Sequence, residues 1–329
     1  MIRSNTFDHA LIKEVLAEPG GEHLLTCWSC GTCASTCLVR RYAPAFNPRL
    51  ILHKAGLGLR AEVLSSPEIW QCSACDACYP RCPKKIHISE VMKAIRNLAI
   101  REGYGRPGTV AQVDVASCIA CGMCVGACPY EAISLETAVC NGGVKRAAQV
   151  NSTLCTSCGI CNSVCLSSSI SVEGYTDTSL NDSFVAALSG TASQGLTTWQ
   201  GKTLVIACKW CLHAAADLAY ATNPPEGIQV VNVPCSGRVT PVFISTALQS
   251  GAEAVLVVGC KENECHYKQG NALEQGRSVM MQNLLELLGI ERERAQFAWL
   301  GALDRGKFPE LVSRVASDVQ ALGPLSWDR

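Results

Sequence analysis

Sixteen of the 22 cysteines in this chain of 329 residues fall in four runs of one form, C-x2-C-x2-C-x3-C. The runs read CWSCGTCASTC, CSACDACYPRC, CIACGMCVGAC and CTSCGICNSVC. Three thiolates separated by two residues each can surround one corner of an iron–sulfur cube, because a tight loop turns them toward a common point. The spacing is the ligand pattern of [4Fe–4S] clusters.

The fourth cysteine of each run lies too far along the chain to close the same cube, so we expect it to ligate the cluster of a paired run. The four runs therefore predict four [4Fe–4S] clusters. Their expected ligand sets are Cys27, Cys30, Cys33 and Cys82; Cys72, Cys75, Cys78 and Cys37; Cys118, Cys121, Cys124 and Cys165; and Cys155, Cys158, Cys161 and Cys128.

Glycine follows the second cysteine in three runs, at Gly31, Gly122 and Gly159. These glycines predict positive φ and close backbone approach in the ligand loops. Structural zinc is the alternative for the sixteen cysteines. Zinc usually takes two C-x2-C pairs with a longer spacer between them, which four compact runs fit poorly.

The composition limits the classes of partner. Basic and acidic residues balance at 28 each, which argues against a nucleic-acid surface or a basic membrane patch. No apolar run approaches the roughly 18 residues of a membrane span, and the N-terminus lacks the apolar core of a signal peptide. We expect a cytoplasmic protein whose thiols ligate metal, from an anaerobic host.

The elements around the first two runs are predicted to be helical. Residues 48–64 and 88–105 carry apolar side chains three and four positions apart, with Ser89 as the expected N-cap and Gly103 as the expected end of the second helix. Residues 1–105 therefore form a helical domain with two [4Fe–4S] clusters.

The next two runs are flanked by strand patterns. Residues 131–136 and 168–175 are predicted strands, and residues 141–153 supply a turn and a returning strand. We expect a second two-cluster domain over residues 106–174. Residues 175–200, rich in Ser, Thr and Gly, are predicted to be a linker.

Residues 201–329 alternate between strand and helix, which predicts a parallel sheet with helices on both faces. The predicted strands are 202–208, 228–235, 254–260 and 295–300, and the predicted helices are 240–252, 278–289 and 307–323. The fold class expected for the whole chain is multidomain α+β, with a helical two-cluster ferredoxin, a bacterial-type α+β ferredoxin and an α/β parallel-sheet domain.

Five further cysteines follow the strands of this last domain: Cys208, Cys211, Cys235, Cys260 and Cys265. The carboxyl ends of parallel strands bind the ligands of open α/β sheets. Five thiols at one rim predict a [2Fe–2S] cluster, for which four are enough. Buried apolar cysteines, a redox dithiol and zinc are the alternatives. His266 is a further candidate ligand. Arg238 is expected either to place positive charge near the cluster or to have a docking or structural role. Cys140 is assigned no role.

Three stretches resemble known families. Residues 27–103, with CWSCGTCASTC and CSACDACYPRCPKKIHISEVMKAIRNLAIREG, resemble the C-type subunit of heterodisulfide reductase. The following ferredoxin stretch is similar to the C-terminal ferredoxin domain of the A-type flavoprotein subunit of that complex. CKWCLHAAADLAY, PCSGRVTPVF and GCKENECHYKQGNA resemble the delta subunit of methyl-viologen-reducing hydrogenase.

The last resemblance implies a [2Fe–2S] cluster held by Cys208, Cys211, Cys260 and Cys265, with Cys235 as a substitute for one of them or a neighbouring thiol. Together the resemblances imply an electron-transfer subunit of a flavin-based bifurcating complex. The implied partners are a flavoprotein like the A-type subunit, which carries the FAD, a protein like the B-type subunit or its replacement, and a dehydrogenase, hydrogenase or reductase.

The chain shows no dinucleotide motif, no phosphate-binding loop and no recognisable acyl-transfer nucleophile. The Cys-Cys-Gly motifs of the catalytic part of heterodisulfide reductase do not occur in the sequence either. We therefore expect no flavin and no catalytic residue in this chain. A zinc-stabilised assembly scaffold and a dithiol redox sensor are the rival functions.

Overall fold

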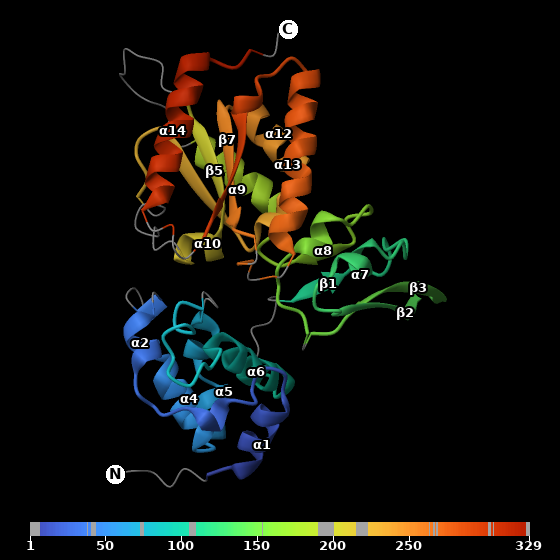
Figure 1. The fold of residues 1–329 in the computed structure, drawn as a ribbon. Helices are drawn as coiled ribbons and strands as arrows, with labels where there is room; N and C mark the ends of the chain where they lie inside the picture. The colour runs from blue at the N-terminus through green and yellow to red at the C-terminus, as the bar shows by residue number, and fades with distance from the viewer. Residues whose placement is uncertain are drawn as a thin grey trace. The chain divides into compact units, whose positions relative to one another are not determined.

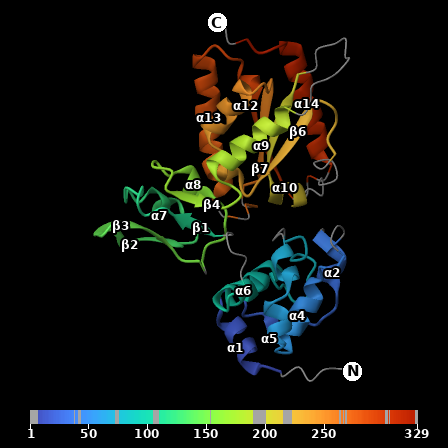
Figure 2. The ribbon, with the colours of Figure 1, turned by 180° about the vertical axis from the view of Figure 1, so that it is seen from behind.

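The computed structural model describes residues 7–326, apart from 38, 41–43, 73–75, 105–109, 153, 190–200, 215–222, 263, 266, 268, 302–303 and 305. The chain forms two compact units, Met1–Pro107 and Gly108–Arg329. The second unit joins the domains predicted over 106–174 and 201–329, whose individual boundaries stay predictions. Figures 1 and 2 show the elements of each unit from opposite sides.

The first unit is helical, as predicted, and its described residues form no strand. Its elements are α1 (His9–Ala17), η1 (Leu24–Thr26), α2 (Thr32–Thr36), α4 (Pro48–Gly56), α5 (Arg60–Leu64), η2 (Pro67–Gln71) and α6 (Ile88–Arg101). Helix α6 buries one face, including Val91, Met92 and Ile95, in a core shared with α1 and α4. This core also contacts the half-buried cysteines Cys27 and Cys72.

Two details of this unit differ from prediction. The helix predicted over 48–64 is split between α4 and α5, because Gly58 has φ 73° and the backbone of Asp8 packs against it. Ser89 is not the N-cap of α6; His87 is, and the Ser89 hydroxyl donates to the carboxylate of Asp76 instead. Gly103, at φ 82°, ends the helix as predicted.

The first part of the second unit contains two antiparallel strand pairs. Strand β1 (Ala111–Val113) pairs with β4 (Ile170–Val172), and β2 (Ile133–Cys140) pairs with β3 (Gly143–Val150). The short helices α7 (Met123–Ala127) and α8 (Ile160–Ser163) follow the glycines of the third and fourth runs. The predicted strands and the returning strand are confirmed.

The rest of the unit contains the predicted parallel sheet, in the order β6-β5-β7-β8. The strands are β5 (Thr203–Cys208), β6 (Ile228–Val233), β7 (Ala254–Cys260) and β8 (Ala295–Leu300). The other elements are α9 (Asp177–Ser189), α10 (Lys209–Ala214), η3 (Ser236–Arg238), α12 (Pro241–Gln249), α13 (Gly270–Leu287), η4 (Arg292–Arg294) and α14 (Lys307–Leu322). Helix α13 begins eight residues before the predicted 278.

Alternate residues of the central strands face opposite layers of helices. Leu204 and Ile206 of β5 pack with α9, α12 and α13, whereas Val205 and Ala207 pack with α14. Figures 1 and 2 show helices on both faces of the sheet. The predicted layering follows from the two-residue period of a strand.

The predicted linker is wrong over Asp177–Ser189, which form α9. Leu180, Phe184 and Leu188 of this helix are buried in the core of the sheet, and Phe184 contacts Phe243 edge-on. These three apolar residues at a spacing of four outweigh the Ser and Thr content that suggested a linker. Residues 190–200 lie outside the described part. No described helix is both long enough and apolar enough to cross a bilayer.

Candidate metal centres

The cysteine runs repeat one backbone conformation that turns their side chains inward. The residue before the second cysteine has positive φ although it is not glycine, at Ser29 (52°), Ala120 (53°) and Ser157 (58°). The glycine after that cysteine is also left-handed, as predicted, at Gly31 (85°), Gly122 (77°) and Gly159 (77°). Each glycine is followed by a short helix that carries the third cysteine.

Three cavities are each lined by three cysteines of one run and the fourth cysteine of the paired run. One cavity is lined by Cys27, Cys30, Cys33 and Cys82. The other two are lined by Cys118, Cys121, Cys124 and Cys165, and by Cys155, Cys158, Cys161 and Cys128. The fold thus brings together these three predicted ligand sets.

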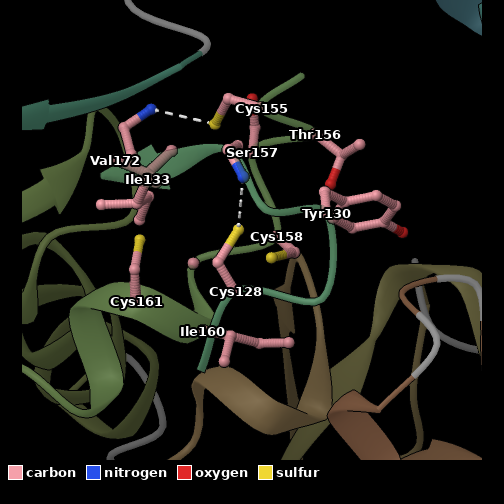
Figure 3. A pocket seen from close by; sticks show the side chains of 13 residues that line it. Cys128, Tyr130, Ile133, Cys155, Thr156, Ser157, Cys158, Ile160, Cys161 and Val172 are labelled. Carbon is pink, nitrogen blue, oxygen red and sulfur yellow. Dashed lines mark hydrogen bonds between the residues drawn. The ribbon is translucent and has the colours of Figure 1, made fainter. Parts of the chain in front are cut away.

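Figure 3 shows the cavity of the fourth run. Four cysteines lie around it together with the apolar side chains of Ile133, Ile160 and Val172. Tyr130 and Thr156 also line it. A pocket of four thiols in an apolar wall fits a sulfur-ligated cluster better than a hydrated ion.

Backbone N–H groups donate to the cysteine sulfurs. Five sulfurs accept such a bond: that of Cys27 from the N–H of Ser29 (3.4 Å), Cys155 from Ala111 (3.4 Å), Cys128 from Ala132 (3.4 Å), Cys118 from Ala148 (3.5 Å) and Cys165 from Ser169 (3.3 Å). Such bonds favour the thiolate form and are one way in which a protein sets the potential of an iron–sulfur cluster.

Burial opposes ionisation of the inner cysteines. It raises the pKa of Cys33 to about 11 and that of Cys158 to about 12. Thiolates at these positions therefore need a compensating positive charge, which bound iron supplies. The donor set and its burial fit an iron–sulfur cluster.

The second run is described only in part, because Cys75 lies outside the described residues. Cys37, Cys72 and Cys78 are half-buried and pack against the core of the first unit. Asp76, with φ 48°, stands where the other runs have glycine. The fourth ligand set stays a prediction.

The rim cysteines lie where the strand order of the sheet reverses. Strand β5 leads to β6 on one side and β7 leads to β8 on the other, so the crevice between β5 and β7 is the usual ligand position of an open α/β sheet. Cys208 and Cys260 end these two strands, with their sulfurs 3.9 Å apart.

The other rim cysteines surround this pair. The Cys211 thiol donates to the carbonyl oxygen of Cys208 at 3.0 Å. Cys235 and Cys265 are hydrogen-bonded to each other, which lowers the pKa of Cys265 to about 6 and raises that of Cys235. Hydrogen bonds from Cys211 and Cys260 hold the pKa of Cys208 well below its usual range. Thiolate character of this kind suits a metal ligand.

The described residues do not form a site for a single metal ion. Within the described residues, no three Cys, His, Asp or Glu side chains converge closely enough to hold one ion. His266 lies outside the described residues. Cys140 sits at the tip of the β2–β3 hairpin, paired with Gly143 and away from the three cavities.

Arg238 contacts the fourth cysteine run. Its buried side chain packs on Gly159 of the fourth run and pairs with Asp177 at 2.5 Å, which makes it a contact between the two parts of this unit.

Glu274 was missed by the sequence reasoning. It is 1% exposed beside the rim, and burial raises the pKa of its carboxyl to about 8. It lies in the first turns of α13, outside the helix predicted over 278–289, so the sequence pattern gave no signal of this burial.

Comparison with known proteins adds to this geometry. Residues 203–323 match the family model described as "Methyl-viologen-reducing hydrogenase, delta subunit". The chain is 41% identical over 133 residues to the D-type iron-sulfur subunit of the F420-non-reducing hydrogenase of Archaeoglobus profundus, covering 97% of that protein and 40% of this chain. The chain belongs to the hydrogenase delta subunit family. This delta-subunit region contains all five rim cysteines.

Outside the delta-subunit region, two stretches match models of a 4Fe-4S dicluster domain, residues 23–86 and 117–169. Together they contain the sixteen cysteines of the four runs. The predicted resemblances are confirmed, and [4Fe–4S] binding is supported.

Two components of heterodisulfide reductases are also similar. The C-type subunit of the H(2):CoB-CoM heterodisulfide,ferredoxin reductase of Methanothermobacter thermautotrophicus is 37% identical over 107 residues, which cover 32% of this chain and 57% of that protein. The A-type subunit of the ferredoxin:CoB-CoM heterodisulfide reductase of Methanosarcina mazei is 32% identical over 120 residues, which cover 36% of this chain and 15% of that protein. The chain is an iron–sulfur protein related to subunits of oxidoreductase complexes.

Proposed function

We propose that this chain holds four [4Fe–4S] clusters and one [2Fe–2S] cluster and passes single electrons within a heterodisulfide reductase-like complex. Iron–sulfur clusters supply one-electron chemistry when bound at these cysteines. The chain's own contribution is to space the sites, exclude water and set the charge around each one.

The observation that carries the proposal is the contact between two different kinds of cysteine site. Cys158 of the fourth run and Cys235 of the rim belong to one buried apolar cluster, together with Ile160 and Tyr267. Cys265, Trp210 and Tyr130 pack against it. Cysteines of the two sites therefore share one buried apolar environment, which supports a relay between neighbouring clusters.

The partners are proposed from the relatives. One relative is a hydrogenase iron-sulfur protein, and others are A-type and C-type subunits of heterodisulfide reductases. We propose a flavoprotein partner like the A-type subunit that carries FAD and bifurcates electrons, a second partner like the B-type subunit or its replacement, and a donor or acceptor dehydrogenase, hydrogenase or reductase.

Metal analysis of the full chain, purified without oxygen, tests the proposal. Four cubes and one two-iron cluster predict about 18 irons per chain with matching sulfide and no zinc. A content of about 16 irons per chain would indicate that the four [4Fe–4S] clusters are present and that the rim cluster is absent. Stoichiometric zinc with little sulfide would favour an assembly scaffold and contradict the electron-transfer function.

The lowered pKa of Cys208 also suits a redox dithiol. Such a sensor needs a reactive thiol but no cluster at the rim. Replacing Cys208 by Ser in a sensor would leave every cluster spectrum intact, whereas in the proposed relay it removes the [2Fe–2S] signal.

A further inference from the structure

Two arginines of the delta-subunit region, the fully buried Arg238 and the half-buried Arg277, contact the fourth cysteine run. Arg238 lies with its Cδ 2.9 Å from the point that a Cβ on Gly159 would occupy. Arg277 of α13 donates to the carbonyl and hydroxyl oxygens of Ser163, both at 3.0 Å. The same guanidinium donates to the carbonyl oxygens of Gly237 and Val239 at 2.8 Å. The pair therefore fixes helix α8 against segment η3.

The positive charge of this pair is compensated only in part by protein groups. Arg238 is fully buried and has one carboxylate partner, Asp177, whose side chain is 47% exposed. Its guanidinium carbon lies 4.9 Å from the ring centre of Phe243, and its Nη1 has no hydrogen-bond partner in the described part of the chain. Arg277 makes hydrogen bonds to neutral oxygens and forms no ion pair with any described residue.

Buried positive charge of this kind is costly unless an anion lies nearby. Burial and the neighbouring Arg238 both lower the pKa of Arg277, which reflects that cost. Besides Asp177 and each other, the groups that interact electrostatically with the two arginines are cysteines. Arg238 interacts electrostatically with Cys161 of the fourth run, and Arg277 with Cys235 of the rim.

The third run provides an internal comparison. Gly122 and Gly159 hold equivalent places and have the same φ of 77°. A Cβ on Gly122 would meet the apolar Leu135 at 3.7 Å, whereas a Cβ on Gly159 would meet Arg238. Among the described residues, no charged side chain lines either cavity directly. Beside the third run, the half-buried Lys145 donates to the carbonyl oxygen of Ala116 at 3.0 Å. The two halves share a backbone, but the charge that packs on the fourth run, Arg238, is fully buried.

We propose that Arg238 and Arg277 raise the reduction potential of the cluster held by Cys128, Cys155, Cys158 and Cys161 above that of the cluster at the third run. The proposal rests on the proposed function, since it requires clusters at both sites. Reduction adds one electron from the donor, with no bond or proton transferred, so the site becomes more negative. A nearby buried positive charge stabilises that reduced form. The fourth-run site, next to the rim, then retains the electron in preference to the third-run site.

Redox titration of the full chain tests the proposal. Chains carrying Arg277→Gln, Arg277→Lys or Arg238→Gln are purified without oxygen, checked for full iron and sulfide, and titrated with dithionite under electron paramagnetic resonance. We expect each glutamine variant to lower the reduced-to-oxidised ratio of one [4Fe–4S] cluster about tenfold at fixed potential, which is about 59 mV for a one-electron couple. Arg277→Lys keeps the positive charge, so its cluster potential should stay close to that of the wild type.

Arg294→Gln is the matched control. Arg294 is as fully buried as Arg238, but its ion-pair partners are Glu253 and Glu291, and none of its hydrogen bonds reaches a cysteine run. Its loss should leave all cluster potentials unchanged. If Arg238→Gln loses iron, Arg277→Gln carries the test, because its partner Ser163 does not line the cavity.

Unchanged potentials in fully loaded glutamine variants would overturn the proposal. So would an equal shift in Arg277→Lys and Arg277→Gln, since that result would assign the effect to lost hydrogen bonds rather than to charge. A wild-type chain without clusters would instead refute the proposed function, and with it this inference. Metal content therefore separates the two failures.

Discussion

The sulfurs of Cys208 and Cys260 lie 3.9 Å apart at the carboxyl ends of two adjacent parallel strands. These cysteines are 52 positions apart in the chain, and the parallel pairing of β5 with β7 brings them together. Their closeness at the reversal point of the sheet makes them the first pair of ligands that we expect for the rim cluster.

Replacing Cys208 or Cys260 by Ser should remove about two irons per chain and the [2Fe–2S] signal, while the [4Fe–4S] signals stay. Iron analysis and electron paramagnetic resonance measure both. Cys140→Ser is the control and should keep every iron, because Cys140 lies on a hairpin away from the described cavities. Full iron content in Cys208→Ser would show that the rim holds no cluster through this residue.

Cys235 and Cys211 offer a test of the remaining ligands. Cys235 is hydrogen-bonded to Cys265, which makes a second pair of neighbouring sulfurs, whereas the Cys211 thiol donates to the backbone oxygens of Cys208 and Val258. We expect Cys235→Ser to abolish the [2Fe–2S] signal and Cys211→Ser to leave part of it. Loss of the [2Fe–2S] signal in Cys211→Ser but not in Cys235→Ser would instead support the ligand set that the family resemblance implies, which contains Cys211.

Gly159→Ala and Gly122→Ala form a matched pair of stability variants. Both residues have φ 77°, so either alanine costs roughly 1–2 kcal/mol of backbone strain. Gly159→Ala should cost more, because its Cβ would lie 2.9 Å from Arg238, while the contact at Gly122 is an ordinary 3.7 Å. Denaturant unfolding without oxygen compares them, and equal losses would mean that Arg238 moves away freely.

Glu274→Gln should change how stability depends on pH. Burial raises the folded pKa of Glu274 to about 8, whereas its unfolded value is near 4.3. Between these values the folded state keeps a proton that the unfolded state has lost. The carboxyl therefore lowers stability by up to about 1.4 kcal/mol for each pH unit of rise.

The glutamine variant lacks this titration, so its advantage over the wild type should grow from pH 5 to pH 8. Unfolding midpoints at several pH values measure it. Glu286→Gln, on the exposed side of the same helix, should follow the wild type. A constant difference across this range would mean that Glu274 is ionised in the folded protein.

Several features of this protein were predictable because they are local. The spacing of each cysteine run defines a loop, and glycine at Gly31, Gly122 and Gly159 identifies where φ must be positive. The four strands of the sheet are continuous apolar runs and were predicted within two residues at each end. Ser89 and residues 177–189 were mispredicted, because residues distant in the sequence decided their roles. The Ser89 hydroxyl donates to the carboxylate of Asp76 instead of capping the helix. Residues 177–189 form a helix because its apolar side chains are buried against the sheet.

The sequence alone determined the kind of chemistry, since thiol spacing and strand periodicity act over a few residues. Only the tertiary structure decided which distant groups meet. It placed Arg238 on Gly159, buried Glu274 beside the rim and put Cys158 and Cys235 in one apolar cluster. No local pattern encodes these contacts, because each depends on how two separately folded elements pack against one another.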